Sequence, residues 1–268
     1  MAEDRDAPVK RNAFARLLDR LRGRGPDGLR RPYVRRHDGF VSLQFVRAQT
    51  QSRMVAGDPE RLLIDYTRTM FAALLWQPAP HLLGMVGLGG GSQVKFAHTH
   101  LPATRIEVVE NNPHVVALRQ AFGVPDDDAR LAVVIDDGAR FVAARPGAFD
   151  VLLVDGYDEH GIPAVLSTQA FYDNCRDALT ADGVMACNLY VRDPEAHVAK
   201  LRQAFGETHV LVVDEPKMSN RVAFAWRGTL PALDADALVA RVPDAVRTRL
   251  TDVLPRLAVR LVRHRTLT

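Results

Sequence analysis

The segment from His81 to Ser92, HLLGMVGLGGGS, constrains the fold of this chain more than any other. Leu82 to Val86 is a short apolar run without polar alternation, which is typical of a strand buried on both faces of a parallel sheet. The glycines that follow let the backbone take positive φ and approach a ligand closely. A helix is predicted from Ser92 to His100, and its unpaired N–H groups would face that turn. The segment predicts a cradle for a nucleotide-type ligand, although such turns also serve as plain tight connections.

Acidic residues recur where the next predicted strands end. The strand from Arg105 ends in Glu110, the strand over 131–135 is followed by Asp136 and Asp137, and the strand over 149–154 is followed by Asp155. The carboxyl ends of parallel strands meet at one edge of a sheet, so these acids are expected to lie together. In nucleotide-binding folds an acid placed like Glu110 accepts hydrogen bonds from the ribose hydroxyls.

Strands and helices alternate along most of the chain, which predicts an α/β fold with a doubly wound, mainly parallel, Rossmann-like sheet. We expect a basic leader over 1–36, a small N-terminal β hairpin subdomain over 37–60, a cofactor-binding catalytic domain over 61–230 and a helical tail over 231–268. Helices are expected at 62–76, 168–179 and 194–205, a fifth strand at 183–190, and a closing antiparallel pair at 209–213 and 221–226.

Composition narrows the functional classes. No apolar run approaches the ~20 residues that span a bilayer, and the charged start of the chain does not resemble a secretory signal. Cys175 and Cys187 have neither metal-ligand nor disulfide spacing, so we expect a cytoplasmic protein without a metal. The leader holds eleven Lys/Arg against five Asp/Glu. Its amphipathic segment at 12–22 is interpreted as a helix that packs on its own domain or on a second subunit, rather than on nucleic acid or a membrane.

At these residues the chain resembles the spermidine synthase (polyamine aminopropyltransferase) family, which has the fold of S-adenosylmethionine-dependent methyltransferases. The similarity covers about Phe40 to Trp226. It rests on GLGGGS, IEVVE, DDGARF and above all VDGYDEHGIPAVLSTQAFYDNCRDAL, whose two acids, proline and FY pair have family-like spacing. NAD-binding folds share the glycines and the ribose acid but not this last segment.

The resemblance implies a role for each matching residue. Glu110 would hold the ribose of decarboxylated S-adenosylmethionine, Asp137 and Gly138 would contact the adenine, and Gly87 and Gly89 would support the chain that bears the sulfonium. The amine acceptor, a small diamine such as putrescine, would face the remaining matched residues. These are Asp155, Tyr157, Asp158 and Tyr66, with Gln51 near the aminopropyl group. The family also implies a homodimer and methylthioadenosine as product.

An aliphatic amine is protonated at neutral pH and cannot attack the carbon next to a sulfonium until it loses a proton. A carboxylate in a partly dry pocket can hold the cation and accept that proton. Asp158 is the candidate base, and Asp155 is its orienting partner on the cofactor side. The alternative for this pair is a plain Asx turn at the end of the strand.

The chain departs from the family pattern at three places. Gly90 stands where the family's glycine turn carries an acid that grips the amine of the decarboxylated donor. Tyr66 is followed by Thr67 and Arg68 rather than by an acid, and the proline after Asp158 is displaced to Pro163. The glycine at position 90 leaves S-adenosylmethionine open as a donor, since its carboxylate would meet no like charge there. A methyltransferase-like enzyme and a non-catalytic nucleoside-binding protein therefore remain alternatives.

Overall fold

The computed structural model describes residues 23–267, except for 26, 47–48, 159–160 and 192. Its central sheet has seven strands in the order β6-β5-β4-β7-β8-β10-β9, and β10 runs antiparallel to both of its neighbours. This confirms the predicted α/β class and the mainly parallel sheet. The strands are β4 (Leu82–Val86), β5 (Arg105–Glu110), β6 (Leu131–Ile135), β7 (Phe149–Val154), β8 (Leu179–Leu189), β9 (Val210–Asp214) and β10 (Arg221–Trp226).

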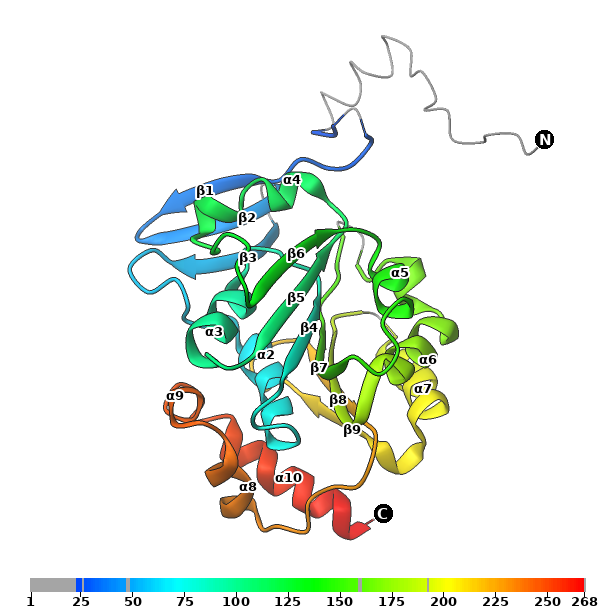
Figure 1. Cartoon of the computed structure of the whole chain (residues 1–268). Helices are drawn as coiled ribbons and strands as arrows, with labels where there is room; N and C mark the ends of the chain where they lie inside the picture. Colours follow the sequence, from blue (N-terminus) through cyan, green and yellow to red (C-terminus); the bar gives the residue numbers. More distant parts are fainter. Residues whose placement is uncertain (1–22, 26, 47–48, 159–160, 192, 268) are drawn as a thin grey trace, which may run out of the picture.

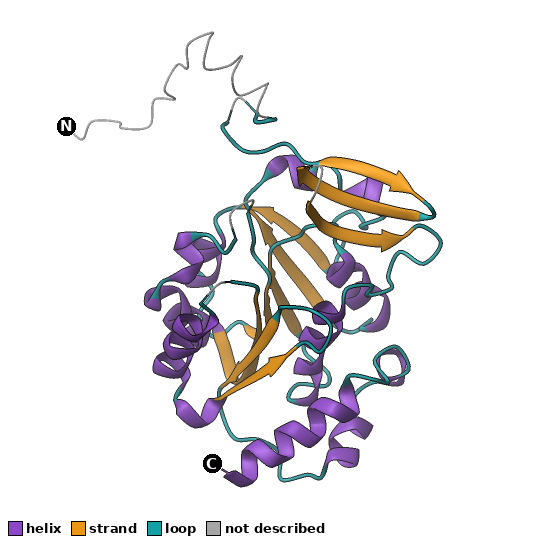
Figure 2. Cartoon of the chain, turned by 180° about the vertical axis from the view of Figure 1, so that it is seen from behind, coloured by secondary structure: helices purple, strands orange, loops and turns teal. Residues whose placement is uncertain are grey.

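Helices cover both faces of this sheet, as Figures 1 and 2 show. Alternate residues of a strand point to opposite faces, and Leu152 and Leu153 accordingly belong to different apolar cores. One core packs under α5 (Gly138–Ala143), α6 (Gln169–Ala178) and α7 (Pro194–Phe205). The other packs under η1 (Phe71–Leu75), α3 (Ser92–His100), α8 (Ala235–Arg241) and α10 (Leu254–Leu267). The shorter helices are α2 (Asp65–Met70), α4 (Pro113–Val116), η2 (Arg119–Phe122), η3 (Ala164–Ser167), η4 (Glu207–His209) and α9 (Asp244–Arg247).

A second, antiparallel sheet of three strands lies beside the central one (Figure 1). It consists of β1 (Tyr33–His37), β2 (Phe40–Val46) and β3 (Gln49–Val55). The hairpin predicted within 37–60 corresponds to β2 and β3, and β1 is an additional strand. Asp38 and Gly39, at the tip between β1 and β2, both have positive φ, of 50° and 75°. That pair is typical of the two-residue turn whose twist matches the flanking strands.

Two predicted helices are broken in the structure. The segment 62–76 forms α2 followed by the 3₁₀ turn η1, and the tail forms α8, α9 and α10 instead of one long helix. Pro243 explains the first interruption of the tail, because proline lacks the N–H that a continuing helix needs. The helix predicted at 12–22 lies outside the described residues.

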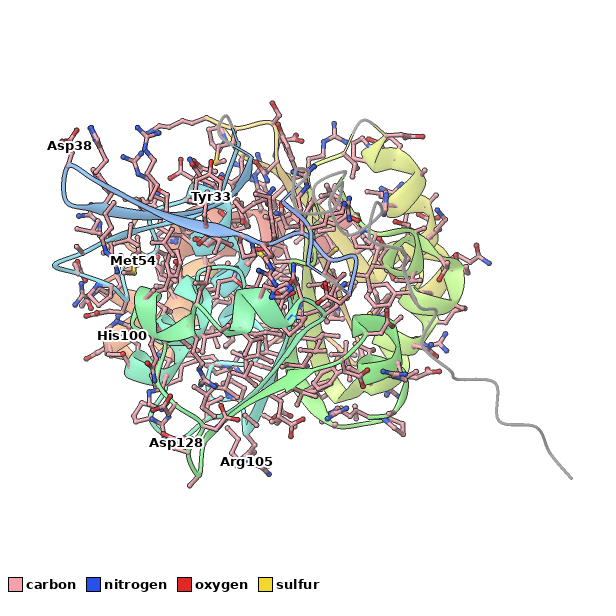
Figure 3. All side chains as sticks on the ribbon, turned by 90° about the horizontal axis from the view of Figure 1, so that it is seen from above. Tyr33, Asp38, Met54, His100, Arg105 and Asp128 are labelled. Carbon is pink, nitrogen blue, oxygen red and sulfur yellow. The ribbon has the colours of Figure 1, made fainter. Side chains whose placement is uncertain are left out.

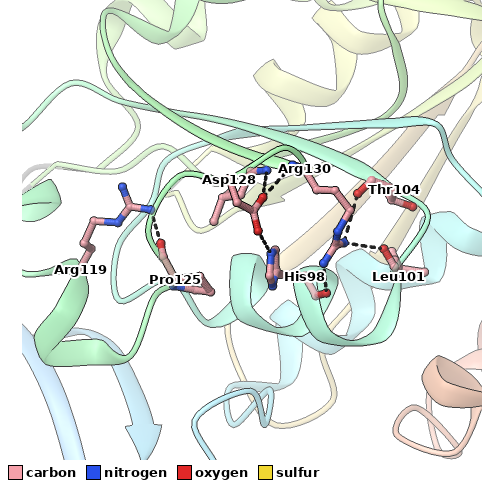
Figure 4. Close-up of polar contacts among 8 residues, drawn as sticks. His98, Leu101, Thr104, Arg119, Pro125, Asp128 and Arg130 are labelled. Carbon is pink, nitrogen blue, oxygen red and sulfur yellow. Dashed lines mark hydrogen bonds and ion pairs between the residues drawn. The ribbon is translucent and has the colours of Figure 1, made fainter.

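The C-terminal end of α3 is fixed by side chains from the β5–β6 region (Figure 4). Arg130 donates to the backbone oxygens of His98, Leu101 and Thr104. Asp128 accepts from His98 Nε2 and from the backbone N–H groups of Arg130 and Leu131. In Figure 3, Asp128 is labelled between His100 and Arg105, on the side of the molecule away from the hairpin tip at Asp38. These bonds satisfy carbonyls that a helix end leaves unpaired.

Candidate active site

A cavity of about 820 Å³ opens at the carboxyl ends of the central strands. It lies where the strand order changes direction, with β5 on one side of β4 and β7 on the other, which is the ligand position general to open α/β sheets. The small sheet and the turn between β9 and β10 complete its walls. The cavity brings together ten residues named from the sequence, which are Gln51, Tyr66, Gly87, Gly89, Glu110, Asp137, Gly138, Asp155, Tyr157 and Asp158.

The glycine turn forms the floor between β4 and α3. Gly87 and Gly89 have φ values of 98° and 52°. A Cβ at position 87 would stand 2.4 Å from the backbone oxygen of Asp155. Glycine is therefore required at position 87, both for its conformation and for the close approach of the loop that follows β7.

Glu110 is the last residue of β5 and faces the same turn. Its two carboxylate oxygens accept from the backbone N–H groups of Leu88, at 3.0 Å, and Asn112, at 2.9 Å. Burial raises the pKa of Glu110, and the backbone N–H groups around it oppose that shift. Glu110 also lines the cavity, so a ligand there would lie against a carboxylate that the backbone holds in place.

The acids that follow β6 have different tasks. Asp136 pairs with Arg140, which lowers the pKa of Asp136. Asp137 is the N-cap of α5, accepts from the backbone N–H of Arg140 at 3.0 Å, and lines the cavity. A Cβ at Gly138 would lie 2.7 Å from the Val86 side chain, so the start of α5 packs directly against β4. Asp137 and Gly138 thus form one wall of the cavity.

Asp155 follows β7 and is held from two sides. Its Oδ2 accepts from the hydroxyl of Tyr66, at 3.0 Å, and its Oδ1 accepts from the side-chain amide of Asn188, at 2.8 Å. The Oδ1 of Asn188 in turn accepts from Asn220 Nδ2 at 2.9 Å. Burial raises the pKa of Asp155, while the bonds from Asn188 and Tyr66 oppose that shift. Burial and the neighbouring Asp155 raise the pKa of Tyr66, so Tyr66 remains a neutral donor.

Tyr157 and Asp158 extend this wall toward the opening. The Tyr157 hydroxyl donates to the backbone oxygen of Asn188, at 2.8 Å, and accepts from the backbone N–H of Tyr190, at 2.7 Å. Asp158 Oδ1 accepts from the backbone N–H of Gly161, at 3.1 Å, in a tight turn. Both side chains line the cavity. Asp158 therefore both forms an Asx turn and lines the cavity.

Gly90 is the one residue of the sequence-based set that does not line the cavity. A Cβ there would approach the Ser52 hydroxyl to 2.6 Å and the Phe122 ring to 3.1 Å. Ser52, on β3, is itself a cavity residue. The space that an acidic side chain would need at position 90 is thus taken by Ser52 and Phe122.

Sequence reasoning missed several polar residues of the cavity. Asn188 and Asn220 orient Asp155, and Asn111 and Asn112 stand beside Glu110. Asn188 lies near the end of the predicted strand 183–190, where the same strand-end argument used for the acids would have found it. Ser52 gives no such signal, because its position depends on how the small sheet packs on the glycine turn.

Known proteins resemble this chain over most of its length. The family model described as "Spermine/spermidine synthase domain" matches residues 89–214. A polyamine aminopropyltransferase of Chromobacterium violaceum is 32% identical over 206 residues, covering 76% of this chain and 78% of the relative. The chain belongs to the polyamine aminopropyltransferase family. Members of this family are transferases, and the recognition made from the sequence is confirmed.

Solved structures of this family and of methyltransferases share the fold. A probable spermidine synthase from Corynebacterium glutamicum superposes with a TM-score of 0.63 at 18% identity, covering 83% of this chain and 91% of that one. Human methyltransferase-like protein 13, solved in complex with SAH, superposes with a TM-score of 0.61 at 25% identity, covering 70% and 93%. The aminopropyltransferase family and methyltransferases thus use one architecture.

Two negative findings apply to the residues that the structure describes. No helix among them is long and apolar enough to cross a membrane. No three His, Cys, Asp or Glu side chains among them converge as metal ligands would.

Proposed function

We propose that this protein transfers an aminopropyl group from decarboxylated S-adenosylmethionine to a small diamine such as putrescine. The observation that carries the proposal is the pairing, in one cavity, of Glu110 beside the glycine turn with Asp155 held by Tyr66 and Asn188. The first group suits a ribose and the second suits an amine. The name of the Chromobacterium relative supports the same reaction.

The donor half of the cavity fits an adenosyl group. Glu110 lies beside the glycine turn, where it would meet the ribose hydroxyls. Asp137 and Gly138 form the wall assigned to the adenine, and Gly87 and Gly89 leave room for the chain that bears the sulfonium. Gln51 lines the cavity from β3, where it would face the aminopropyl carbons. The adenosyl donor supplies an activated carbon next to a positively charged sulfur.

The acceptor half supplies a proton acceptor and an orienting group. In the proposed step the amine nitrogen forms a bond to the aminopropyl carbon, the carbon–sulfur bond breaks, and methylthioadenosine leaves as a neutral thioether. The amine first gives a proton to Asp158, while Asp155, fixed by Tyr66 and Asn188, holds the nitrogen in line. Alignment of the two reactants supplies much of the rate gain, since the leaving group is already good.

The test is direct. Purified protein incubated with decarboxylated S-adenosylmethionine and putrescine is expected to release methylthioadenosine and spermidine in equal amounts. Release of neither product, under conditions where calorimetry shows methylthioadenosine bound, would remove the proposal and leave the nucleoside-binding protein.

One observation favours a second function. Position 90 carries no acid and its side-chain space is filled by Ser52, so an intact S-adenosylmethionine carboxylate would meet no like charge there. The likeness to human methyltransferase-like protein 13 supports a methyl-transferring enzyme on the same fold. Titration with both donors separates the two functions, because a strong preference for the decarboxylated form excludes this second candidate.

We also propose a cytoplasmic location and a homodimeric assembly for this protein. Cys175 and Cys187 are free and buried, which suits a reducing cytoplasm. The family resemblance suggests a homodimer, which light scattering on the purified protein would test.

A further inference from the structure

Two large apolar side chains stand exposed at the acceptor end of the cavity. Tyr190 is 55% exposed and Met218 is 37% exposed, and both line the cavity. Large side chains of this kind, gathered at a binding site, often mark contact with an apolar ligand. A putrescine-sized dication would leave them in water.

The backbone places these two residues at the same end. Tyr190 follows β8 directly, and its N–H donates to the Tyr157 hydroxyl. Met218 lies in the turn between β9 and β10, two positions before Asn220. Asn220 bonds the side chain of Asn188, which holds Asp155.

The register of β8 and β10 places Tyr190 at the same end. Leu189 pairs with Arg221 across the sheet, so Tyr190 stands next to Asn220. Tyr190 and Met218 therefore lie beyond Asp155, at the end of the cavity that we call the mouth.

The donor occupies the other end of the cavity. Val165 is a third exposed apolar residue of the cavity, and its neighbour Leu166 packs against both Gly156, next to Asp155, and Gly138, at the start of α5. An acceptor whose nitrogen lies at Asp155 thus extends away from the donor, toward Tyr190 and Met218. Lys217, exposed in the same turn, also lines the cavity.

We infer that the preferred acceptor is a primary amine with an apolar hydrocarbon chain longer than that of putrescine, held by Tyr190 and Met218. This inference rests on the proposed aminopropyl transfer and names its acceptor class. Each methylene buried at the mouth is expected to raise kcat/KM about fourfold until the mouth is filled.

The experiment compares butylamine, pentylamine and hexylamine with putrescine, at saturating decarboxylated S-adenosylmethionine, by methylthioadenosine release. We expect kcat/KM to rise about fourfold with each added methylene and hexylamine to exceed putrescine. Putrescine as the best acceptor, or a flat chain-length series, would overturn the inference while leaving aminopropyl transfer intact. Calorimetric affinities of the same amines for the protein saturated with methylthioadenosine give an independent reading, so an inactive protein still tests the inference.

Substitutions at Tyr190 and Met218 test whether these two side chains cause the dependence of kcat/KM on chain length. In the variants Tyr190→Ala and Met218→Ser, we expect the factor by which kcat/KM rises with each added methylene to fall close to one. Tyr33→Ala is the matched control, since Tyr33 is also exposed but lies on β1, outside the cavity lining, and should keep the fourfold ratio. A ratio unchanged in folded Tyr190→Ala and Met218→Ser proteins would contradict the assignment. Should either variant fail to fold, the chain-length series on the unmodified protein decides alone.

Discussion

At the scale of single residues, Asp155 is the group on which the polar contacts of the cavity converge. Tyr66 and Asn188 each donate to one of its oxygens, and the bond from Asn220 to Asn188 fixes the amide in the orientation that donates. A carboxylate held at both oxygens has a fixed orientation, which suits the proposed role of Asp155 in holding the amine nitrogen. Asp158 lines the same cavity and accepts a backbone N–H at Oδ1, and it is the residue that we propose as the base.

The Asp158→Asn variant tests this division of roles. The amide keeps an oxygen for the Gly161 N–H but cannot take up the proton of the amine. We expect kcat to fall about a hundredfold or more, the usual scale for loss of a general base, while the affinity for methylthioadenosine stays unchanged. Single-turnover rates and calorimetry would measure the two quantities, and normal turnover would reject Asp158 as the base.

The hydrogen bonds to Asp155 predict a change in the pH profile. Burial raises the pKa of Asp155, and the bonds from Asn188 and Tyr66 favour its charged form and lower that pKa. Removing either donor, in Asn188→Ala or Tyr66→Phe, should therefore raise the pKa further. The acid limb of kcat/KM is expected to move to higher pH in both variants. Tyr172→Phe is the control, because the Tyr172 hydroxyl bonds His197 instead, and an equal shift there would contradict the account.

The sequence predicted the charged part of this site better than the neutral part. Glu110, Asp137 and Asp155 were found because acids at successive strand ends form a visible pattern, and the cavity contains all three. Asn188 and Asn220 orient Asp155 without carrying charge. Asn220 comes from β10, whose place next to β8 depends on the sheet order, and no local pattern in the sequence states that order.

At the scale of elements, α3 carries the glycine turn at one end and is tied down at the other. Lys95, inside the helix, donates to the Phe122 backbone oxygen at 2.6 Å. Burial lowers the pKa of Lys95 to about 8. The contacts of Asp128 and Arg130 hold the last turn of α3. The helix that follows the glycine turn is thus anchored both within its length and at its end.

The Asp128 contacts predict how stability depends on pH. The bonds from His98 and from the Arg130 and Leu131 N–H groups lower the pKa of Asp128 from 3.8 to about 2. The stabilising contribution of the carboxylate is therefore complete above about pH 3.8 and is lost as the pH falls toward about 2. Asp128→Asn keeps an oxygen for the backbone bonds, so wild type should be the more stable at neutral pH and the two should converge near pH 2. Urea unfolding across this range checks it, and a difference independent of pH would contradict it.

Element boundaries show where sequence reasoning succeeds. The strands β4, β5, β6 and β7 match their predicted limits, since each is a short apolar run between turn residues. The strand β1 was missed because its arginines and histidine leave most of its length exposed and give no apolar alternation. Asp38 and Gly39 were the available signal, because a turn of that type requires a strand on each side.

At the scale of the whole molecule, the small sheet and the central sheet share the cavity, and they meet at Gly90. A Cβ there would stand 2.6 Å from the Ser52 hydroxyl and 3.1 Å from both the Ser52 Cβ and the Phe122 ring. Neither sheet alone forms the cavity, since Gln51 and Ser52 come from one and Glu110 and Asp155 from the other. The packing of these two surfaces is therefore expected to control both the stability of the fold and the shape of the cavity.

A double-mutant cycle measures this coupling. Gly90→Ala is expected to cost about 1–3 kcal/mol of unfolding free energy, because the methyl group overpacks the contact with Ser52. Ser52→Gly removes both close atoms of that side chain, so Gly90→Ala should cost clearly less in the Ser52→Gly background, with a coupling of at least about 0.5 kcal/mol. The affinity for methylthioadenosine should follow the same pattern, since the donor site depends on the same contact. Additive effects in chemical unfolding would mean that the two sheets do not meet at Gly90 as the structure describes.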